Sequence, residues 1–226
     1  MSARGFFVTG TDTGVGKTLV ACALLHAFAA RGLRVVGMKP VAAGAELKNG
    51  VLLNDDVEQL IAASNVSAPH NIVNPYCFVP PIAPHIAANL CNNLIKINKL
   101  CDRFRQLSAL ADVVVVEGVG GFCVPLNDQE TSADLAEQLA LPVLMVVGMR
   151  LGCLNHALLT AEAIRARGLV LAGWISNHLD PMMMHADANV ASLQSRIGAP
   201  LIARIAFSKA RDAAVIATQF ELPALS

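Results

Sequence analysis

The amino-acid sequence predicts an α/β fold, in which helices cover both faces of a doubly wound, mostly parallel sheet. Short apolar segments alternate with longer helical ones along the 226 residues, an order typical of such a sheet with right-handed crossovers. Several apolar segments have no polar face, as expected of strands buried on both sides. Aromatic residues make up only 4% of the chain, which disfavours a β-sandwich.

The alternation predicts six strands and six helices, taken in order along the chain. The strands are expected at 5–9, 34–38, 112–116, 142–148, 170–176 and 201–206. The helices are expected at 17–30, 56–63, 95–109, 132–139, 155–166 and 185–197. Residues 67–93, rich in Pro and Asn, break this order and are predicted to form an insertion over the edge of the sheet. No linker divides the rest, so we expect one domain over residues 1–226.

Charge and composition narrow the classes of function. The 17 Lys and Arg residues balance 17 Asp and Glu residues, so no net field attracts nucleic acid or an anionic membrane. The chain is 54% hydrophobic, unlike a disordered protein, and no apolar run reaches the length of a membrane span. The six cysteines include no CxxC pair, which disfavours zinc or a redox dithiol. Because no signal peptide is evident, we expect a cytoplasmic protein with reduced thiols.

Polar side chains follow four of the predicted strands, at the ends where ligands bind in open parallel sheets. Lys17 and Thr18 come just after the first strand, and Lys39 comes after the second. Glu117 and Asn177 follow the third and the fifth. These positions predict one binding site along the carboxyl ends of the strands.

Residues 10–18 link the first strand to the first helix and end in Gly16-Lys17-Thr18, as in a phosphate-binding loop. In such a loop the backbone N–H groups surround the phosphates, Lys17 binds the β- and γ-phosphates, and Thr18 holds Mg²⁺. Thr11 stands where the strict motif has its first glycine. A glycine-rich turn without a ligand is the alternative, which the position at a strand–helix junction disfavours. The domain is therefore predicted to be a P-loop NTPase-like nucleotide-binding domain.

Carboxylates in two places are candidates for the Mg²⁺ site. A hydrophobic strand runs into Glu117-Gly118, as in the carboxylate-bearing strand of nucleotide-binding folds. Asp55 and Asp56 lie at the start of a predicted helix, and Asn54 or Asp55 is equally suited to cap that helix. Spacing alone leaves both interpretations of this loop open.

Lys39 adds a second cation beside the phosphate loop. It stands before Pro40 at the end of the second strand, where Lys17 already serves nucleotide binding. A kinase or synthetase that transfers phosphate to a weak acid needs positive charge at the acceptor, and Lys39 is the predicted source. An exposed lysine without a function is the alternative. The side chain is expected to face a solvated site and to pack against little.

Together these residues are similar to those of the dethiobiotin synthetase family. The resemblance covers most of the chain and is strongest from residue 7 to residue 177. It rests on an ordered set of short motifs: VTGTDT (8–13), VGKT (15–18), GMKPV (37–41), NPY (74–76), APH (83–85), VEG (116–118), GG (120–121), LGC (151–153), NHA (155–157) and AGW (172–174) with Asn177. Each motif alone is modest evidence, whereas the set in this order is specific.

The resemblance implies an ATP-dependent cyclo-ligase of biotin biosynthesis that works as a homodimer with Mg²⁺. Its substrates are then ATP, CO₂ or bicarbonate, and 7,8-diaminononanoate. One amine becomes a carbamate, which attacks the γ-phosphate to give a carbamic–phosphoric anhydride. The second amine closes the cyclic urea of dethiobiotin and releases phosphate. Neither nucleic acid nor a membrane takes part.

The resemblance also implies roles for individual residues. The nucleotide-binding set comprises Asp12, Thr13, Gly14, Val15, Gly16, Lys17, Thr18, Asp56, Glu117, Gly118, Asn177 and Ala206. Within that set, Asn177 reads the adenine, and Mg²⁺ is held by Thr18, Asp56 and Glu117. The catalytic set comprises Lys39, Lys17 and Thr13, the last of them near the carbamate. The substrate set comprises Lys39, Ala43, Gly152 and Asn155, the last two from the neighbouring subunit.

Three positions depart from the family's pattern. Ala43 stands where the family often has Ser, which removes a hydroxyl contact to the substrate. Ala206 stands where a proline is usual on the adenine side, and His178 stands where an acid is common. These departures bear on base selectivity and substrate affinity rather than on the chemistry.

Two other classes of protein share the expected fold. A regulatory ATPase of the partition-switch type often carries a lysine early in the loop, where this chain has Asp12. A glutamine-dependent amidoligase of the cobyrinate type needs a glutaminase domain, for which 226 residues leave no room. ATP turnover that depends on a diamine, as against turnover stimulated by a macromolecule, separates the three classes.

Overall fold

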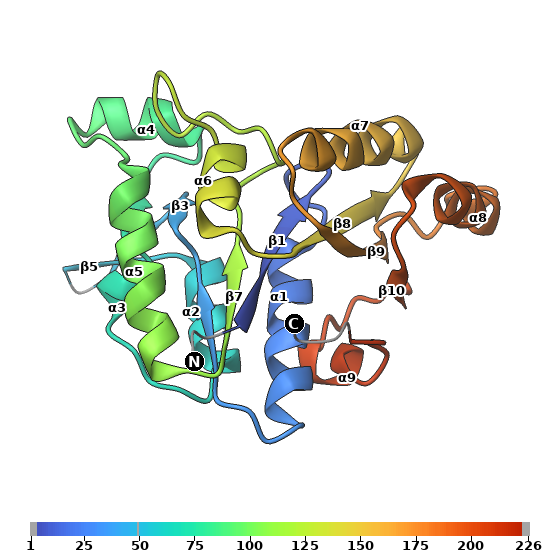
Figure 1. Cartoon of the computed structure of the whole chain (residues 1–226), viewed down its shortest axis with the longest axis horizontal. Coiled ribbons are helices and arrows are strands. Elements are labelled where there is room, and N and C mark those ends of the chain that lie inside the picture. The colour runs from blue at the N-terminus through green and yellow to red at the C-terminus, as the bar shows by residue number, and fades with distance from the viewer. Residues whose placement is uncertain (1–3, 49, 223–226) are drawn as a thin grey trace.

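The part of the chain that the computed structural model describes, residues 4–48 and 50–222, is built around a six-stranded sheet in the order β10-β9-β8-β1-β7-β2 (Figure 1). Its strands are β1 (Arg4–Gly10), β2 (Val35–Met38), β7 (Val113–Glu117), β8 (Val143–Met149), β9 (Leu171–His178) and β10 (Leu201–Ile205). Each neighbouring pair is parallel. The predicted α/β class and the six predicted strands are confirmed, with ends that differ by one or two residues.

The register of the sheet brings predicted site residues to one edge. Val8 pairs with Glu117, and Met38 pairs with Val116. Lys39 and Glu117 therefore lie side by side at the carboxyl ends of β2 and β7. Strand β1 lies between β7 and β8 and leads directly into the phosphate loop.

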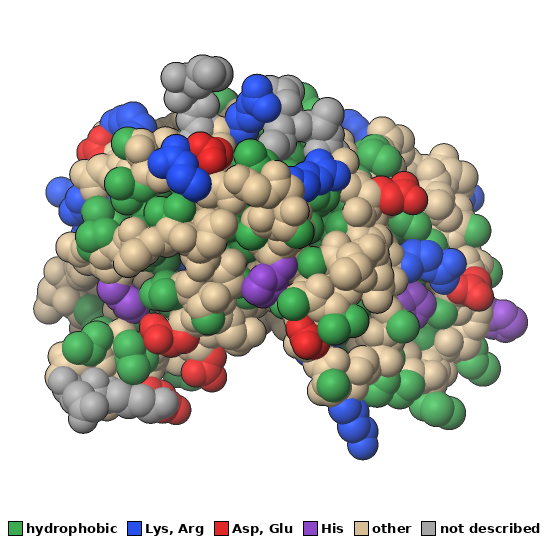
Figure 2. Space-filling view, turned by 90° about the horizontal axis from the view of Figure 1, so that it is seen from below, with side chains coloured by type: hydrophobic (Ala, Val, Ile, Leu, Met, Phe, Trp, Pro, Cys, Tyr) green, Lys and Arg blue, Asp and Glu red, His purple; other side chains and the backbone are tan. Residues whose placement is uncertain are grey.

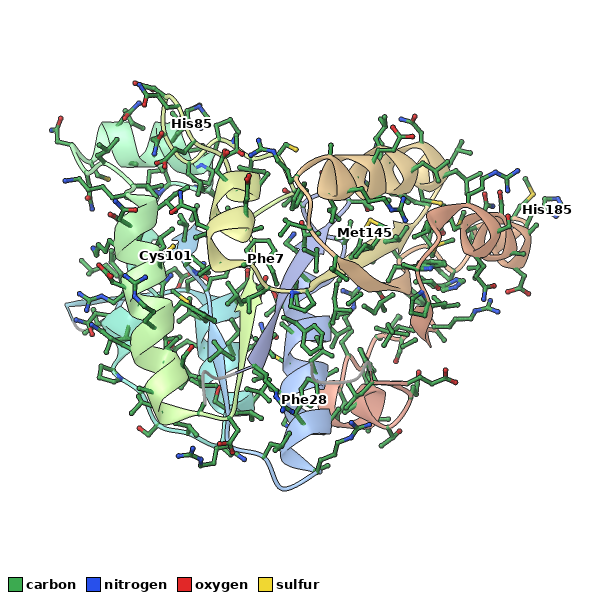
Figure 3. All side chains as sticks on the ribbon, in the orientation of Figure 1. Phe7, Phe28, His85, Cys101, Met145 and His185 are labelled. Carbon is green, nitrogen blue, oxygen red and sulfur yellow. The ribbon has the colours of Figure 1, made fainter. Side chains whose placement is uncertain are left out.

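Helices cover both faces of the sheet, as predicted (Figure 1). One face carries α1 (Lys17–Ala29), α2 (Asp55–Ala63) and α9 (Ala213–Ala217), and the other carries α5 (Ile97–Leu110), α6 (Ser132–Leu139), α7 (Cys153–Ala166) and α8 (Ala186–Ile197). Alternate residues of β1 point into the two layers. Phe6 stacks on Phe28 of α1 with 5.8 Å between ring centroids, whereas Phe7 packs into the opposite layer. Figure 3 shows Phe7 and Met145 on the sheet and Phe28 on α1.

The segment predicted as an insertion contains α3 (His70–Val73), β6 (Tyr76–Phe78) and α4 (Pro84–Leu90). Strand β6 pairs in parallel with β3 (Val41–Ala43), and β4 (Glu46–Lys48) forms an antiparallel pair with β5 (Val51–Leu53). The backbone N–H of Lys39, just after edge strand β2, donates to Val73 at 2.9 Å. These elements and α9 are missing from the sequence prediction because they are too short to show hydrophobic periodicity.

The described surface mixes side chains of every kind. On the face shown in Figure 2, basic, acidic and hydrophobic side chains are interspersed. This distribution agrees with the even balance of 17 basic and 17 acidic residues in the sequence. Within residues 4–48 and 50–222, no helix is both long enough and apolar enough to cross a membrane.

Candidate active site

The predicted site residues meet where β1, β2 and β7 end. Lys17 and Thr18 begin α1, directly after the loop that leaves β1. Lys39 follows β2, and Glu117 is the last residue of β7. Asp56, near the start of α2, reaches the same place. Five polar side chains thus converge at the predicted edge of the sheet.

Two glycines shape the phosphate loop. Gly14 and Gly16 have φ angles of 73° and 93°, in the left-handed region that favours glycine. A β-carbon on Gly16 would come within 2.2 Å of the Nδ2 atom of Asn177. Asn177 is 2% exposed and donates from that atom to the backbone oxygen of Val15 at 2.7 Å. Asn177 therefore supports the loop, while its contact with adenine stays a prediction.

The start of α1 is arranged to receive an anion. Its N-cap, Gly16, has no side chain, which leaves the N–H groups of the first turn for a ligand. Lys17 is buried, and its Nζ donates to the backbone oxygen of Asp12 at 3.1 Å. Burial and the nearby charge of Lys39 lower the pKa of Lys17 to about 8. A bound phosphate would favour the charged form of this lysine.

Lys39 lies at the centre of a buried charge cluster. Its Nζ donates to Asp56 Oδ2 at 2.8 Å and to Glu117 Oε1 at 2.5 Å. The hydroxyl of Thr18 lies 2.8 Å from Asp56 Oδ1 and 2.9 Å from Glu117 Oε1. The expectation that Lys39 faces a solvated site is wrong, because the residue is only 4% exposed. Lys39 is buried because the carboxylates of Asp56 and Glu117 enclose its amine. Its position at the end of a strand could not predict those contacts.

The backbone of Lys39 is fixed by the residues that follow α3. Asn74 Nδ2 donates to the backbone oxygens of Lys39 at 2.6 Å and of Tyr76 at 3.1 Å. Asn74 itself is 4% exposed. Asn74 belongs to the NPY motif of residues 74–76, but no role was predicted for it from the sequence. The available signal was an amide side chain directly before Pro75, at the end of the short helix.

Burial and ion pairing shift the pKa values of this cluster in opposite directions. Burial lowers the pKa of Lys39, but Glu117 and Asp56 outweigh it, so the pKa rises and the amine stays protonated. Burial raises the pKa of Glu117 against the pull of Lys39. For Asp56, burial is outweighed by Lys39, and the pKa falls. Lys39 is therefore a fixed cation between two different carboxylates. Asp56 is firmly ionised, whereas burial destabilises the negative charge of Glu117.

The residues predicted to hold Mg²⁺ fit that ion. Thr18, Asp56 and Glu117 present a hydroxyl and two carboxylates, which are oxygen ligands of the kind that Mg²⁺ takes with phosphate oxygens and water. Among the described residues, Glu117 Oε2 is buried without a hydrogen-bond partner and is available to a ligand. No cluster of three or more His, Cys, Asp or Glu side chains that could hold a metal occurs in the described ranges. Bound Mg²⁺ would therefore depend on oxygens of the nucleotide and of water.

The loop before α2 resolves which residue caps that helix. Asn54 Oδ1 accepts the backbone N–H of Asp56 at 3.1 Å, so Asn54, one of the two capping residues left open by the sequence, caps α2. Asp55 is exposed, and Asp56 is the carboxylate that faces the cluster. Asn54 Nδ2 also donates to the backbone oxygen of Ala43 at 3.2 Å. The predicted substrate residue Ala43 thus lies beside the helix that carries Asp56.

The turn from β8 to α7 brings in a residue that the sequence analysis missed. Arg150 forms an ion pair with Asp12 of the phosphate loop. Gly152, with a φ of 94°, and Asn155 in the first turn of α7 are both exposed. Arg150 stands just after the strand predicted at 142–148. Because ligands bind at the carboxyl ends of parallel strands, that position was the signal that could have identified it.

Two more predicted residues are Thr13, within the phosphate loop, and Gly118, just after β7. Thr13 is exposed, and a β-carbon on Gly120 would lie 3.5 Å from its hydroxyl, so Thr13 faces the segment after β7. Gly118 continues the line of β7, and its N–H donates to the backbone oxygen of Val8 at 2.9 Å. The loops after β1 and β7 therefore face each other across the site.

A hollow of about 370 Å³ lies at the carboxyl ends of β9 and β10, lined in part by His178 and Ala206. Leu179 and Val15 both approach Gly148 of β8 closely. Leu179 directly follows His178, and Val15 belongs to the phosphate loop, so the segment after β9 passes close to that loop. The volume of the hollow lies within the range of small-ligand sites, which makes it the candidate base pocket.

Comparisons with known proteins show which family the chain resembles. Residues 4–214 match a family model described as an AAA domain. An ATP-dependent dethiobiotin synthetase of Aromatoleum aromaticum is 54% identical over 220 residues, which cover 97% of this chain and 98% of that protein. A second ATP-dependent dethiobiotin synthetase, from Nitrosospira multiformis, is 55% identical over 210 residues, 93% of this chain and 91% of that protein.

Solved structures with similar folds have much lower identity. A ParA family ATPase of Chlorobium tepidum aligns with a TM-score of 0.56 and 14% identity, over 96% of this chain and 90% of that one. The MinC:MinD complex of Aquifex aeolicus gives a TM-score of 0.58 and 16% identity, over 92% and 82%. These likenesses show the fold, whereas the closer sequences show that the chain belongs to the family of the ATP-dependent dethiobiotin synthetases.

Proposed function

We propose that the chain forms dethiobiotin from 7,8-diaminononanoate and CO₂ at the expense of ATP, in the biosynthesis of biotin. Membership of the dethiobiotin synthetase family supports this activity. The observation that carries it is the convergence of Lys17, Lys39 and two carboxylates at the end of a phosphate loop. A protein that only binds nucleotide has no need of a second, fully enclosed lysine at that place.

The proposed reaction begins when the nitrogen of one neutral amine of the substrate bonds to the carbon of CO₂ and releases a proton, which gives a carbamate anion. A carbamate oxygen attacks the γ-phosphorus, the bond between the β- and γ-phosphates breaks, and ADP leaves. The second amine attacks the carbonyl carbon of the resulting carbamic–phosphoric anhydride. Phosphate leaves with the bonding electron pair, a proton is released, and the cyclic urea is complete.

In this mechanism the two lysines have different tasks. Lys17 meets the β- and γ-phosphates from the start of α1, where the N–H groups are available. Lys39 is held as a cation by its carboxylate partners, next to the oxygens that gain charge as the phosphoryl group is transferred. A positioned charge that needs no reorganisation stabilises a transition state more than a ground state. Thr13, which is exposed in the phosphate loop, would contact the carbamate.

Thr18, Asp56 and Glu117 would hold Mg²⁺ in this proposal. When bound, the ion neutralises charge on the β- and γ-phosphates. The Thr18 hydroxyl already lies 2.9 Å from Glu117 Oε1 and 2.8 Å from Asp56 Oδ1, so the three side chains meet at one place. The base of ATP is assigned to the hollow beside His178 and Ala206.

A second subunit is part of the proposal. Helices α4 and α7 lie along the same margin of the molecule (Figure 1). Large hydrophobic side chains are exposed there: Ile86, Leu90, Leu151 and Leu159. Leu151 is 98% exposed beside Gly152, and exposed hydrophobic side chains gathered on one side of a molecule are typical of a surface that another protein covers. The substrate set formed by Lys39, Ala43, Gly152 and Asn155 would then be completed across the dimer, in a reducing cytoplasm that suits six free cysteines.

The decisive experiment measures ADP release and product mass together. We expect negligible ATP turnover until both 7,8-diaminononanoate and bicarbonate are present, and a cyclic urea formed in step with ADP thereafter. A monoamine analogue provides the control, since it can form a carbamate but cannot close the ring. Turnover that ignores the diamine, or that needs a macromolecule, would instead support a regulatory ATPase.

A further inference from the structure

Arg150 joins the turn after β8 to the phosphate loop through an ion pair with Asp12. We propose that Arg150 is a positioning residue, which holds the Asp12 carboxylate in place and cancels its charge so that the loop can accept the phosphates of ATP. The inference rests on the proposed ATP-dependent function. Nothing in the sequence motifs assigns a role to this arginine.

Asp12 makes a different contact with each of its oxygens. Its Oδ1 accepts the backbone N–H of Thr13 at 2.7 Å, and its Oδ2 accepts the guanidinium of Arg150. Its backbone oxygen accepts Nζ of Lys17 at 3.1 Å. Asp12 thus sets the backbone at Thr13 and holds the lysine that must meet the phosphates.

The same carboxylate places a negative charge inside a loop that binds a polyanion. Arg150 is the basic side chain that the described structure pairs with it. Both groups are partly exposed, at 46% for Arg150 and 44% for Asp12, so the pair contributes little to folding stability. The pair instead contributes to ligand binding, because the Asp12 carboxylate without its arginine partner would repel the phosphates.

The backbone on both sides of the pair is fixed. The N–H of Thr11 donates to Val146 of β8 at 3.0 Å, and the N–H of Cys153 donates to the backbone oxygen of Arg150 at 3.0 Å. Arg150 therefore reaches the loop from an anchored turn rather than from a free surface position. Because only one nitrogen of the guanidinium contacts Asp12, a lysine at position 150 can supply the same charge.

The test compares Arg150→Met, Arg150→Lys, Asp12→Asn and the double variant Asp12→Asn/Arg150→Met. The probe is a non-hydrolysable ATP analogue with Mg²⁺ at low ionic strength, measured by equilibrium binding. Arg150→Met should weaken binding about fivefold, the upper range for one exposed ion pair. The KM for ATP should rise by the same factor while kcat stays within about twofold. Arg150→Lys should bind as the unmodified protein does.

The double variant separates charge compensation from a purely structural role. The amide oxygen that Asp12→Asn introduces can still accept the N–H of Thr13, whereas the negative charge is gone, so adding Arg150→Met to Asp12→Asn should weaken binding by less than about twofold relative to Asp12→Asn alone. The matched control is Arg34→Met, which breaks the exposed pair of Arg34 with Asp112 at the other end of the sheet and should leave binding unchanged.

Two results would overturn the inference: Arg150→Met binding the analogue as tightly as Arg34→Met does, or Arg150→Met weakening binding as much in the Asp12→Asn background as in the unmodified protein. A failure of the proposed function looks different. In that case the unmodified protein shows no turnover that depends on the diamine, while the binding series still reports on Arg150.

Discussion

Strands β2 and β7 have an ion pair at each end, and the two pairs lie in opposite environments. Near the amino ends, Arg34 and Asp112 are 2.8 Å apart with side chains 62% and 39% exposed. Near the carboxyl ends, Lys39 and Glu117 are 2.5 Å apart with side chains 5% and 1% exposed. The same two strands therefore carry one pair in water and one pair almost entirely removed from it.

The difference shows which end of the sheet is built for chemistry. An exposed pair costs little desolvation and contributes little to stability. A buried pair loses the hydration of both charges, and the attraction between them often fails to recover that loss. A chain that keeps such a pair beside a phosphate loop has used folding energy to hold charge in place, which is the arrangement that transition-state stabilisation requires.

The largest effect is expected from Lys39→Ala. Removing a preorganised charge typically lowers kcat by about 10²–10³, and the affinity for ATP should change less because Lys17 remains. Removing one partner of a buried pair also destabilises the fold, here by about 3 kcal/mol, at the low end because Glu117 can take up a proton. Steady-state kinetics, ATP binding and urea unfolding on one preparation measure the three quantities.

Arg34→Met is the control for that variant, since Arg34 stands just before β2, at the opposite end of that strand from Lys39. It should leave kcat unchanged. A normal kcat in Lys39→Ala would show that the buried pair of Lys39 and Glu117 has only a structural role. The geometry of the site would then no longer support a synthetase.

The next effect concerns the two carboxylates that enclose Lys39. Glu117→Gln and Asp56→Asn should each lower Mg²⁺-dependent turnover at least about tenfold, since even outer partners of a metal site contribute that much. Asp55→Asn is the matched control, because Asp55 is the adjacent carboxylate and is exposed. Titrating Mg²⁺ against turnover and against nucleotide binding measures the effect. Should Asp55 prove to be the sensitive position, the assignment of this loop fails.

The comparison also shows what the sequence could predict. The strands, the phosphate loop and the strand-end positions of Lys39 and Glu117 follow from hydrophobic pattern and topology, and all lie where expected. The burial of Lys39 does not follow, because it depends on Asp56 reaching across from α2 and on Asn74 holding the backbone. Such contacts join residues far apart in the chain. The hydrophobic periodicity of strands (two residues) and of helices (3.6 residues) contains no information about them.

A smaller effect is expected from pH. The pKa of Lys17 is about 8 in the folded chain against an ordinary value of 10.5. Between these values the unfolded chain binds the extra proton, so the stability of the unliganded protein should rise with pH across that window. Affinity for the ATP analogue should fall about fivefold from pH 8 to pH 9, because the neutral lysine must first regain its proton.

Binding and thermal unfolding measured across the same pH series test both directions of that effect. Lys17→Met is the control for the series, since it removes the titrating amine and should flatten both curves. An affinity that is constant from pH 7 to pH 9.5 would show that Lys17 keeps its positive charge even when no phosphate is bound. The surroundings of Lys17 would then be more polar than its burial indicates.

The smallest effect is expected at the exposed end of the same strands. Arg34→Met and Asp112→Asn should each leave turnover unchanged and shift the melting temperature only slightly, because water replaces the lost partner at little cost. Raising the salt concentration should erase even that shift, since screening acts strongly on exposed charges. The double variant Arg34→Met/Asp112→Asn measures the coupling directly. A strong coupling that persists at high salt would mean that this pair, like the one between Lys39 and Glu117, is protected from solvent, and the contrast between the two ends of β2 and β7 would be lost.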